Sequence, residues 1–217
     1  MNRGRRPARA PRCWYKALTV ALLAGLLSGC ETVPESAQSV AVDDPAAAFD
    51  TRQAVLGNIQ HWFASGRLAL ATASESTTAS VRWEQRAAGY TIRLTGPLGA
   101  GAVELRGTDG QVSLKADGKE HRAPDADTLL REVAGLELPV NGLRYWLMGL
   151  AAPGQAVAGL RFDNGGRLEY LEQAGWKIRY LRYGKTELLD MPTKLFMDSA
   201  QVRARVVVQE WGFKQAS

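Results

Sequence analysis

The residue types that most often carry chemistry are few in this chain and lie far apart. The two histidines, His61 and His121, have no second type of metal ligand at the short spacing of a zinc site. No G-x-S-x-G sequence is present, so a hydrolase nucleophile elbow is not indicated. The glycines of a dinucleotide-binding loop lead directly into a helix, whereas no predicted helix follows Gly99 and Gly101. The acidic residues are scattered along predicted strands, although two carboxylates could still converge in the fold. The sequence therefore predicts no metal and no cofactor, and it leaves an enzyme as an open alternative.

Cys30 is the residue whose surroundings indicate a specific modification. A basic segment ends at Lys16, and an eleven-residue apolar stretch, Ala17–Leu27, follows it. This stretch is too short to span a bilayer as a helix, which needs about 20 residues, and is typical of an export signal. The ending LSGC resembles the bacterial lipobox, in which the cysteine is lipidated and becomes the first mature residue. We predict Cys30 as the attachment site of acyl chains such as palmitate, and the alternative is an ordinary signal peptide with a chance cysteine.

The chain is predicted to divide into a removed signal peptide, a lipidated cysteine with a flexible tether, and a folded domain, at residues 1–29, 30–45 and 46–217. Cys13 lies in the signal peptide, so Cys30 is the cysteine that remains and no disulfide is expected within the mature chain. Residue 31 is Glu rather than the Asp often associated with retention in the inner membrane. We therefore expect a lipid-anchored protein of the outer membrane that faces the periplasm.

The positive charge of the chain is concentrated at its N-terminus. A formal net charge of +5 and a pI of about 9.4 would suit a nucleic-acid partner. The first 29 residues contain six basic residues and no acid, however, and without them the chain has 21 basic and 22 acidic residues. Four arginines in the C-terminal half are interleaved with apolar residues and are interpreted as outward-facing strand positions: Arg179, Arg182, Arg203 and Arg205. The charge of the domain thus argues against a nucleic-acid partner.

Hydrophobic periodicity predicts an α+β domain. A first helix is expected between residues 46 and 64, with an apolar face made of Phe49, Leu56, Ile59 and Phe63. After Gly66, apolar residues alternate in short runs separated by turn signals, as in an antiparallel meander. Two further helices interrupt the strands, one capped by Asp125 or Asp127 and one capped by Asn141. Ten or eleven strands and three helices together predict a curled antiparallel sheet with a helical insertion at its middle.

One predicted hairpin carries an unusual tip. In TGPLGAGAVEL, Thr95–Leu105, the tip residue is Leu98, where Asn, Asp, Gly or Ser is usual. Burial of Leu98 in the core is one explanation, whereas Pro97 and Gly99 favour a stiff tip that protrudes from the domain.

Three motifs together resemble the LolB family of outer-membrane lipoprotein receptors. They are the lipobox at Cys30, GPLG at Gly96–Gly99 followed by AVEL, and LPVNGLRYWLMGL at Leu138–Leu150, which is the most specific of the three. The resemblance implies an open half-barrel of about eleven strands, covered by three helices and enclosing an apolar cavity. It also implies a chaperone of protein transport rather than an enzyme, which accepts lipoproteins from a LolA-like periplasmic carrier and inserts them into the outer membrane. No nucleotide, metal or cofactor is implied, and we expect a monomer.

The resemblance implies roles for individual residues as well. Pro97, Leu98 and Gly99 would form a membrane-insertion loop, and Arg144 would act as a gate or partner contact, with a solvated charge as the alternative. The residues expected around the acyl-chain cavity are Leu68, Leu70, Trp83, Ile92, Leu94, Leu143, Trp146, Leu147 and Trp176. Ordinary core packing is the alternative for these nine. For the protein as a whole, the alternatives are another lipid-binding or assembly lipoprotein of the outer membrane, and an anchored envelope hydrolase.

Overall fold

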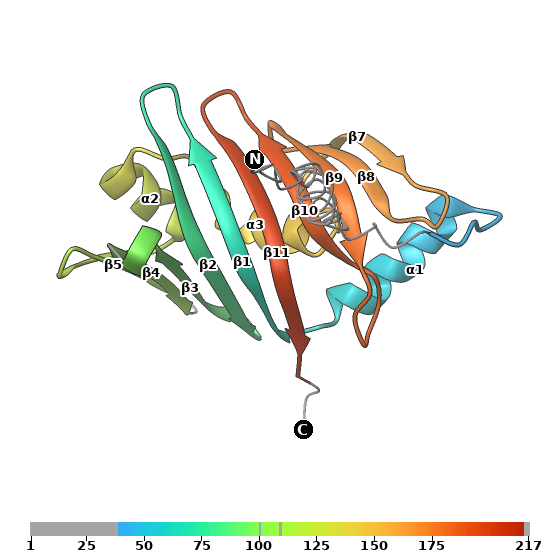
Figure 1. Ribbon diagram of the computed structural model, residues 1–217, viewed down its shortest axis with the longest axis horizontal. Helices are drawn as coiled ribbons and strands as arrows, with labels where there is room; N and C mark the ends of the chain where they lie inside the picture. The colour runs from blue at the N-terminus through green and yellow to red at the C-terminus, as the bar shows by residue number, and fades with distance from the viewer. Residues whose placement is uncertain (1–38, 100, 109, 215–217) are drawn as a thin grey trace, which may run out of the picture. The chain divides into compact units, whose positions relative to one another are not determined.

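A single antiparallel sheet of 11 strands organises the described part of the chain (Figure 1). The computed structural model describes residues 39–99, 101–108 and 110–214, so the predicted signal peptide, Cys30 and most of the predicted tether lie outside the described residues. The strands are β1 (His61–Ala71), β2 (Ser76–Arg86), β3 (Gly89–Thr95), β4 (Ala102–Thr108), β5 (Gln111–Ala116), β6 (Lys119–Ala123), β7 (Val157–Phe162), β8 (Leu168–Gln173), β9 (Trp176–Gly184), β10 (Met191–Asp198) and β11 (Arg203–Phe213). Their order across the sheet is β6-β5-β4-β3-β2-β1-β11-β10-β9-β8-β7.

The sheet consists of two meanders, β1 to β6 and β7 to β11, which are joined where β1 pairs with β11. Strands β6 and β7 remain as two edges, so the sheet curls without closing. The helices of the described residues are α1 (Pro45–Gly57), α2 (Ala126–Ala134) and α3 (Val140–Leu147), and α2 and α3 lie in the connection between the two meanders. The predicted α+β architecture, an open curled antiparallel sheet with three helices, is confirmed.

The first helix is shorter than predicted. α1 ends at Gly57, and the chain enters β1 at His61, so the prediction of a helix up to residue 64 is wrong. Trp62 and Ala64 alternate on the buried side of β1, which is hydrogen-bonded to β2 on one side and to β11 on the other. This pairing with two neighbours outweighs a local spacing that also fits a helix.

The predicted N-terminal cap of α2 is confirmed, and the predicted N-terminal cap of α3 is wrong. Asp125 caps α2, as predicted, because its carboxylate accepts a hydrogen bond from a backbone N–H in the first turn. Asn141 does not cap α3, which begins at Val140 after Pro139 and has no local side-chain cap. The carboxylate of Asp127 on α2 instead accepts a hydrogen bond from the N–H of Val140 at 3.2 Å. A tertiary contact thus replaces the local cap and ties the two helices together.

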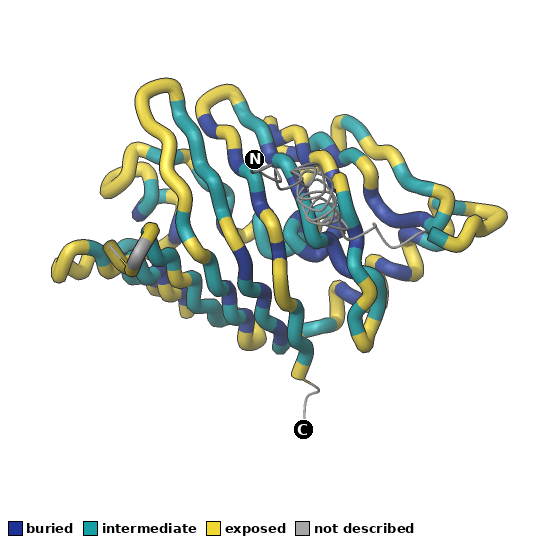
Figure 2. Tube along the Cα trace, viewed as in Figure 1, coloured by how far each residue is buried: buried dark blue, intermediate teal, exposed yellow. Residues whose placement is uncertain are grey.

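The inner face of the sheet, which α2 and α3 cover, forms the core. Buried and exposed residues alternate along the long strands (Figure 2). Aromatic rings connect neighbouring strands, because the ring centroid of Trp62 lies 5.7 Å from that of Trp83 and 5.6 Å from that of Trp211. Gly66 on β1 faces a bulge in β11, where a Cβ atom would collide with the carbonyl oxygen of Val207. The close approach of these backbones requires glycine and brings the centre of the sheet together.

Candidate functional site

An apolar cavity of about 160 Å³ lies between the inner face of the sheet and the α2–α3 segment. Strands β1 to β5 and β9 to β11 provide most of its wall, and Leu130, Leu138 and Leu143 belong to the residues that cover it. Of the 21 described residues that line the cavity, 20 have apolar or aromatic side chains. The other is Ser65, whose hydroxyl donates a hydrogen bond to Glu210 at 3.0 Å. Such a wall offers neither a charged group nor a free acceptor for a polar ligand, and suits a hydrocarbon.

The structure brings eight of the nine predicted cavity residues together around this space: Leu68, Leu70, Trp83, Ile92, Leu94, Leu143, Leu147 and Trp176. They come from five different elements. Period-two alternation places the six strand residues on one face of the sheet, and Leu143 and Leu147 face them from α3. Sequence reasoning missed further members of the same wall, namely Val81, Val103, Leu105, Leu114, Met197, Val206 and Val208. The alternation of apolar residues along their strands indicates that these side chains face inward, but it does not distinguish a cavity wall from a packed core.

Trp146 is the predicted cavity residue that does not line the cavity. Its side chain is fully buried, and its indole N–H donates a hydrogen bond to the amide oxygen of Gln173 at 2.8 Å. Leu143 and Leu147 are four residues apart and share the cavity side of α3, whereas Trp146 is rotated toward β8. The hydroxyl of Tyr180 donates to the carbonyl oxygen of Trp146 at 2.8 Å. Trp146 therefore anchors α3 on the sheet.

Gln173 completes this anchor, and the sequence analysis did not identify it. Its side chain is buried, accepts from the N–H of Ala152 as well as from Trp146, and donates to the carbonyl oxygens of Ala152 and Gln155. All four contacts have distances between 2.8 and 3.0 Å. A buried amide with every polar atom bonded fixes its partners in place. Gln173 thereby holds the end of the helical cover over β8.

A polar groove of about 500 Å³ adjoins the cavity, and Leu138 and Trp176 line both spaces. Asp127, Arg131 and Glu137 contribute charge to this groove. Burial raises the pKa of the Asp127 carboxyl, and the hydrogen bond from Val140 opposes that rise. The apolar cavity and the charged groove thus share a boundary formed by the side chains of Leu138 and Trp176.

The predicted loop residues connect two cavity strands. Pro97–Gly99 forms the short 3-10 turn η1 between β3 and β4, whose Ile92, Leu94, Val103 and Leu105 line the cavity. The N–H of Gly99 donates to the carbonyl oxygen of Gly96 at 3.2 Å, and Gly99 has a φ of 79°. Pro97 and Gly99 are exposed, and the side chain of Leu98 lies outside what the structure describes.

Arg144 does not line the cavity. Its guanidinium carbon lies 4.8 Å from the ring centroid of Tyr145, and the side chain is half-buried. Its predicted role as a gate or partner contact stays a prediction. Within the described residues, no group of three or more His, Cys, Asp or Glu side chains could hold a metal ion.

Comparison with known proteins decides the family. The model of the family described as "Outer membrane lipoprotein LolB" matches residues 60–211. The chain belongs to the LolB family. It is 39% identical over 199 residues to the outer-membrane lipoprotein LolB of Nitrosococcus oceani, which covers 91% of this chain and 98% of that protein. It is 40% identical over 197 residues to the LolB protein of Alkalilimnicola ehrlichii, with 90% and 96% covered, and 34% identical over 191 residues to that of Pseudomonas aeruginosa, with 88% and 92% covered.

The fold is shared more widely than the LolB sequence. A LolA superfamily protein from Nitrosomonas europaea superposes with a TM-score of 0.53 at 8% identity, over 82% of this chain and 96% of that one. LolB proteins are outer-membrane lipoproteins that act in lipoprotein targeting and are not enzymes, so this chain is a lipoprotein receptor of the Lol pathway. Within the described residues, no helix is long and apolar enough to cross a membrane.

Proposed function

We propose that this LolB protein accepts lipoproteins from a LolA-like periplasmic carrier, binds their acyl chains in the apolar cavity and inserts them into the outer membrane. The observation that carries the proposal is the wall of the cavity, which is apolar at 20 of its 21 residues. Each methylene group that leaves water for such surroundings gains about 0.8 kcal/mol. An acyl chain therefore needs an apolar container to cross the periplasm, and transfer without an energy source needs a container that binds it more tightly than the carrier does.

The cavity has to widen to receive its cargo. Its 160 Å³ is smaller than the roughly 300–1,000 Å³ of typical small-molecule sites. α3 is held at its end by Tyr180 and Gln173, whereas the contact of Asp127 with Val140 joins α2 to the start of α3. We expect α2 and the segment up to Pro139 to move outward while the end of α3 stays on the sheet.

The polar groove beside the cavity suits the other half of an amphiphilic cargo. Acyl chains that enter past Leu138 and Trp176 would leave the polar backbone of the lipidated cysteine beside Asp127, Arg131 and Glu137. The polar part of the cargo then stays solvated while its hydrocarbon is buried. Arg144 remains a candidate carrier contact, and the protein is proposed to act as a monomer anchored through Cys30.

The two faces of β1 offer a matched pair of variants for a transfer assay. The carrier is loaded with a radiolabelled lipoprotein, the protein is added, and label on the protein and on added liposomes is followed. Leu68→Gln introduces an amide into the cavity, and we expect about tenfold less uptake. Ala69→Gln makes the adjacent change on the opposite face and should leave uptake unchanged. Equal uptake by both variants would remove the cavity from the mechanism.

The same assay separates the alternatives. If wild-type protein takes no label from the carrier, the carrier hand-off is wrong and another lipid cargo becomes the better hypothesis. If the label appears as hydrolysis products, the protein is an envelope hydrolase.

The η1 loop is proposed to deliver the cargo into the membrane. Leu98→Glu places a charge at its tip and should leave uptake intact while lowering insertion into liposomes, because a carboxylate does not enter hydrocarbon. Leu98→Ile is the matched control and should insert cargo normally. Normal insertion by Leu98→Glu would show that the tip does not contact lipid during delivery.

A further inference from the structure

The outer face of β9, β10, β11 and β1, opposite the cavity, is rich in cations. Strand register places its side chains in rows, one of which joins Arg179, Phe196 and Arg205 across β9, β10 and β11. The neighbouring row, Ile178, Met197 and Ala204, points inward, and Met197 and Ala204 line the cavity. The cations of this face, which we call the outer basic face, are Arg67, Lys177, Arg179, Arg182, Lys194, Arg203 and Arg205.

The carboxylates on the same strands leave these cations largely uncompensated. Two acidic side chains of these four strands share the outer basic face, Asp198 and Glu210, and Glu172 on the adjacent strand β8 lies opposite Lys177. Asp198 lies 2.7 Å from Arg205 and 3.5 Å from Arg179, while Glu210 accepts its hydrogen bond from a serine. Among the described residues, the other cations of this face form no ion pair within 4.0 Å, namely Arg67, Lys177, Arg182, Lys194 and Arg203. The face therefore carries a net positive charge, although the chain without its first 29 residues has 21 basic and 22 acidic residues.

Apolar side chains lie exposed among these cations. Leu181 on β9 is 46% exposed and Val207 on β11 is 41% exposed. Phe196 is stacked under the guanidinium of Arg205, whose central carbon lies 4.3 Å from the ring centroid. Guanidinium groups and ammonium groups bind phosphate oxygens, and neighbouring apolar side chains enter the boundary between head groups and acyl chains. Cations mixed with exposed apolar residues suit the surface of an anionic membrane better than an aqueous anion.

The arrangement of the fold supports contact with a flat surface. In Figure 1 the sheet is viewed from its outer face, with α3 behind it, and the η1 turn lies on the viewer's side of β3 and β4. The outer basic face and the η1 turn are therefore directed to the same side of the domain. A membrane on this side of the domain would face both.

We propose that the outer basic face of this LolB protein docks on anionic phospholipid head groups of the membrane that it serves. Docking orients the domain by charge, independently of the lipid anchor and of any cargo. The interaction should weaken as salt is added, because ions screen exposed charges. At 0.1 M ionic strength the attraction is largely lost beyond about 10 Å.

The test measures binding of the chain without its predicted signal peptide, residues 30–217, to vesicles, because the six basic residues and the apolar stretch of residues 1–29 would bind anionic lipid by themselves. All proteins carry Cys30→Ser, so that no lipid is attached at that position. Vesicles of phosphatidylethanolamine with about one quarter phosphatidylglycerol are compared with vesicles of phosphatidylcholine alone, at low and high salt. We expect binding that requires phosphatidylglycerol and falls at high salt. Binding that is the same on both vesicles would overturn the proposal.

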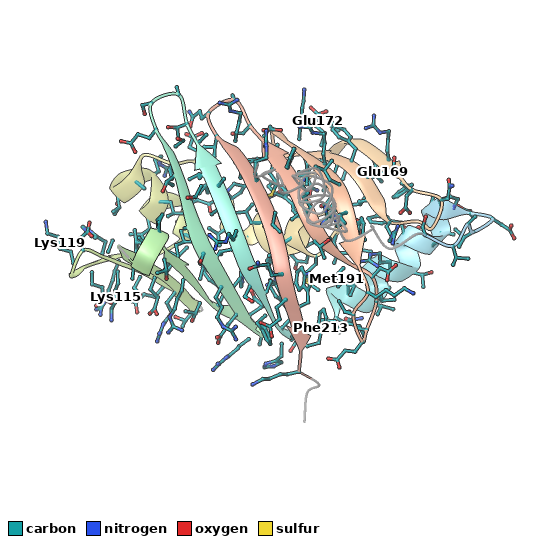
Figure 3. All side chains as sticks on the ribbon, viewed as in Figure 1. Lys115, Lys119, Glu169, Glu172, Met191 and Phe213 are labelled. Carbon is teal, nitrogen blue, oxygen red and sulfur yellow. The ribbon has the colours of Figure 1, made fainter. Side chains whose placement is uncertain are left out.

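Two sets of three substitutions locate the contact. Arg67→Glu, Lys177→Glu and Arg203→Glu together should weaken binding to the anionic vesicles about tenfold or more. The control set Lys115→Glu, Lys119→Glu and Lys185→Glu changes the net charge equally, and it should retain most of the binding. Lys115 and Lys119 lie at the β5–β6 end of the sheet, away from the outer basic face (Figure 3). Equal losses in the two sets would mean that net charge alone is sensed, and the proposal would fail.

Two further measurements keep the result interpretable. Arg67→Gln, Lys177→Gln and Arg203→Gln remove the charges without reversing them and should show an intermediate loss, and thermal unfolding shows whether each variant is folded. A reversed set that binds vesicles like the parent protein but takes no lipoprotein from the carrier would assign this face to the carrier and overturn the proposal. Because vesicle binding is measured without cargo, failure of this inference leaves the proposed transfer function untouched.

Discussion

The two faces of the central strands differ in what they contribute. On β1 and β11 the inner positions Leu68, Leu70 and Val206 line the cavity, while the outer positions Arg67 and Arg205 point to the opposite side. The same strands therefore supply a hydrocarbon wall and a cationic surface, one residue apart. Because side chains alternate with a period of two, each face can change without changing the other. Apolar burial should dominate stability, whereas charge on the outer face should act mainly on partners.

Removal of a buried inner residue should produce the largest change in stability. Leu195 on β10 is fully buried, and Leu195→Ala should lower the free energy of unfolding by about 2–5 kcal/mol, since it deletes packing and leaves a cavity. The neighbouring outer residue gives the control, because Lys194→Ala should change it by less than about 0.5 kcal/mol. Urea unfolding of both variants measures the difference. Similar losses of unfolding free energy in the two variants would contradict the expectation that the inner face dominates stability.

Disruption of the anchor of α3 should have an intermediate effect. Gln173→Leu leaves the indole N–H of Trp146 and the backbone groups of Ala152 without their partner, which should cost about 1–3 kcal/mol. Glu172→Gln, at the adjacent outer position, keeps an oxygen that can accept from the Tyr170 hydroxyl and should be nearly neutral. Thermal unfolding compares the two. A Gln173→Leu protein as stable as the parent would show that water replaces the lost contacts.

The carboxylates of the outer face should contribute least. Hydrogen bonds from Arg82 and Arg93 hold the pKa values of Glu84 and Glu104 below their usual value of 4.5. Their stabilisation is therefore present above that pH and is lost as the pH falls through the lowered values. Glu84→Gln with Glu104→Gln should lower stability at neutral pH by less than about 1 kcal/mol, because the pairs face solvent. Urea unfolding from neutral pH to about pH 2 should show the difference from wild type shrinking, and a growing difference would refute this assignment.

The sequence predicted those features that depend on alternation along a strand. Leu68, Leu70, Ile92 and Leu94 lie in runs that alternate and were named as cavity candidates from the family resemblance, and the structure places them around one cavity. Helix limits were harder, because Trp62 fits both a helical spacing and a strand. The pairing of β1 with both β2 and β11 decides between them, and β11 is far away in sequence.

Contacts between elements account for the remaining differences. The helical spacing groups Trp146 with Leu143 and Leu147, and nothing local shows that a glutamine on β8 captures its indole. The cap of α3 likewise comes from Asp127 on another helix rather than from Asn141. The net charge of the domain was correctly close to zero, but it could not show that the cations gather on one face. Only strand register reveals that arrangement.

The position of β11 has a consequence for how the protein reaches its native state. The last strand of the chain lies in the middle of the sheet, between β1 and β10, and pairs Trp62 with Phe213. Each meander can form from local hairpins, but their union must wait until the C-terminus has left the translocation channel. Until then β1 and β10 expose unpaired edges and the cavity lacks Ala204, Val206 and Val208. The cavity wall is thus incomplete until the final strand arrives, and in that interval the unpaired edges expose the chain to aggregation.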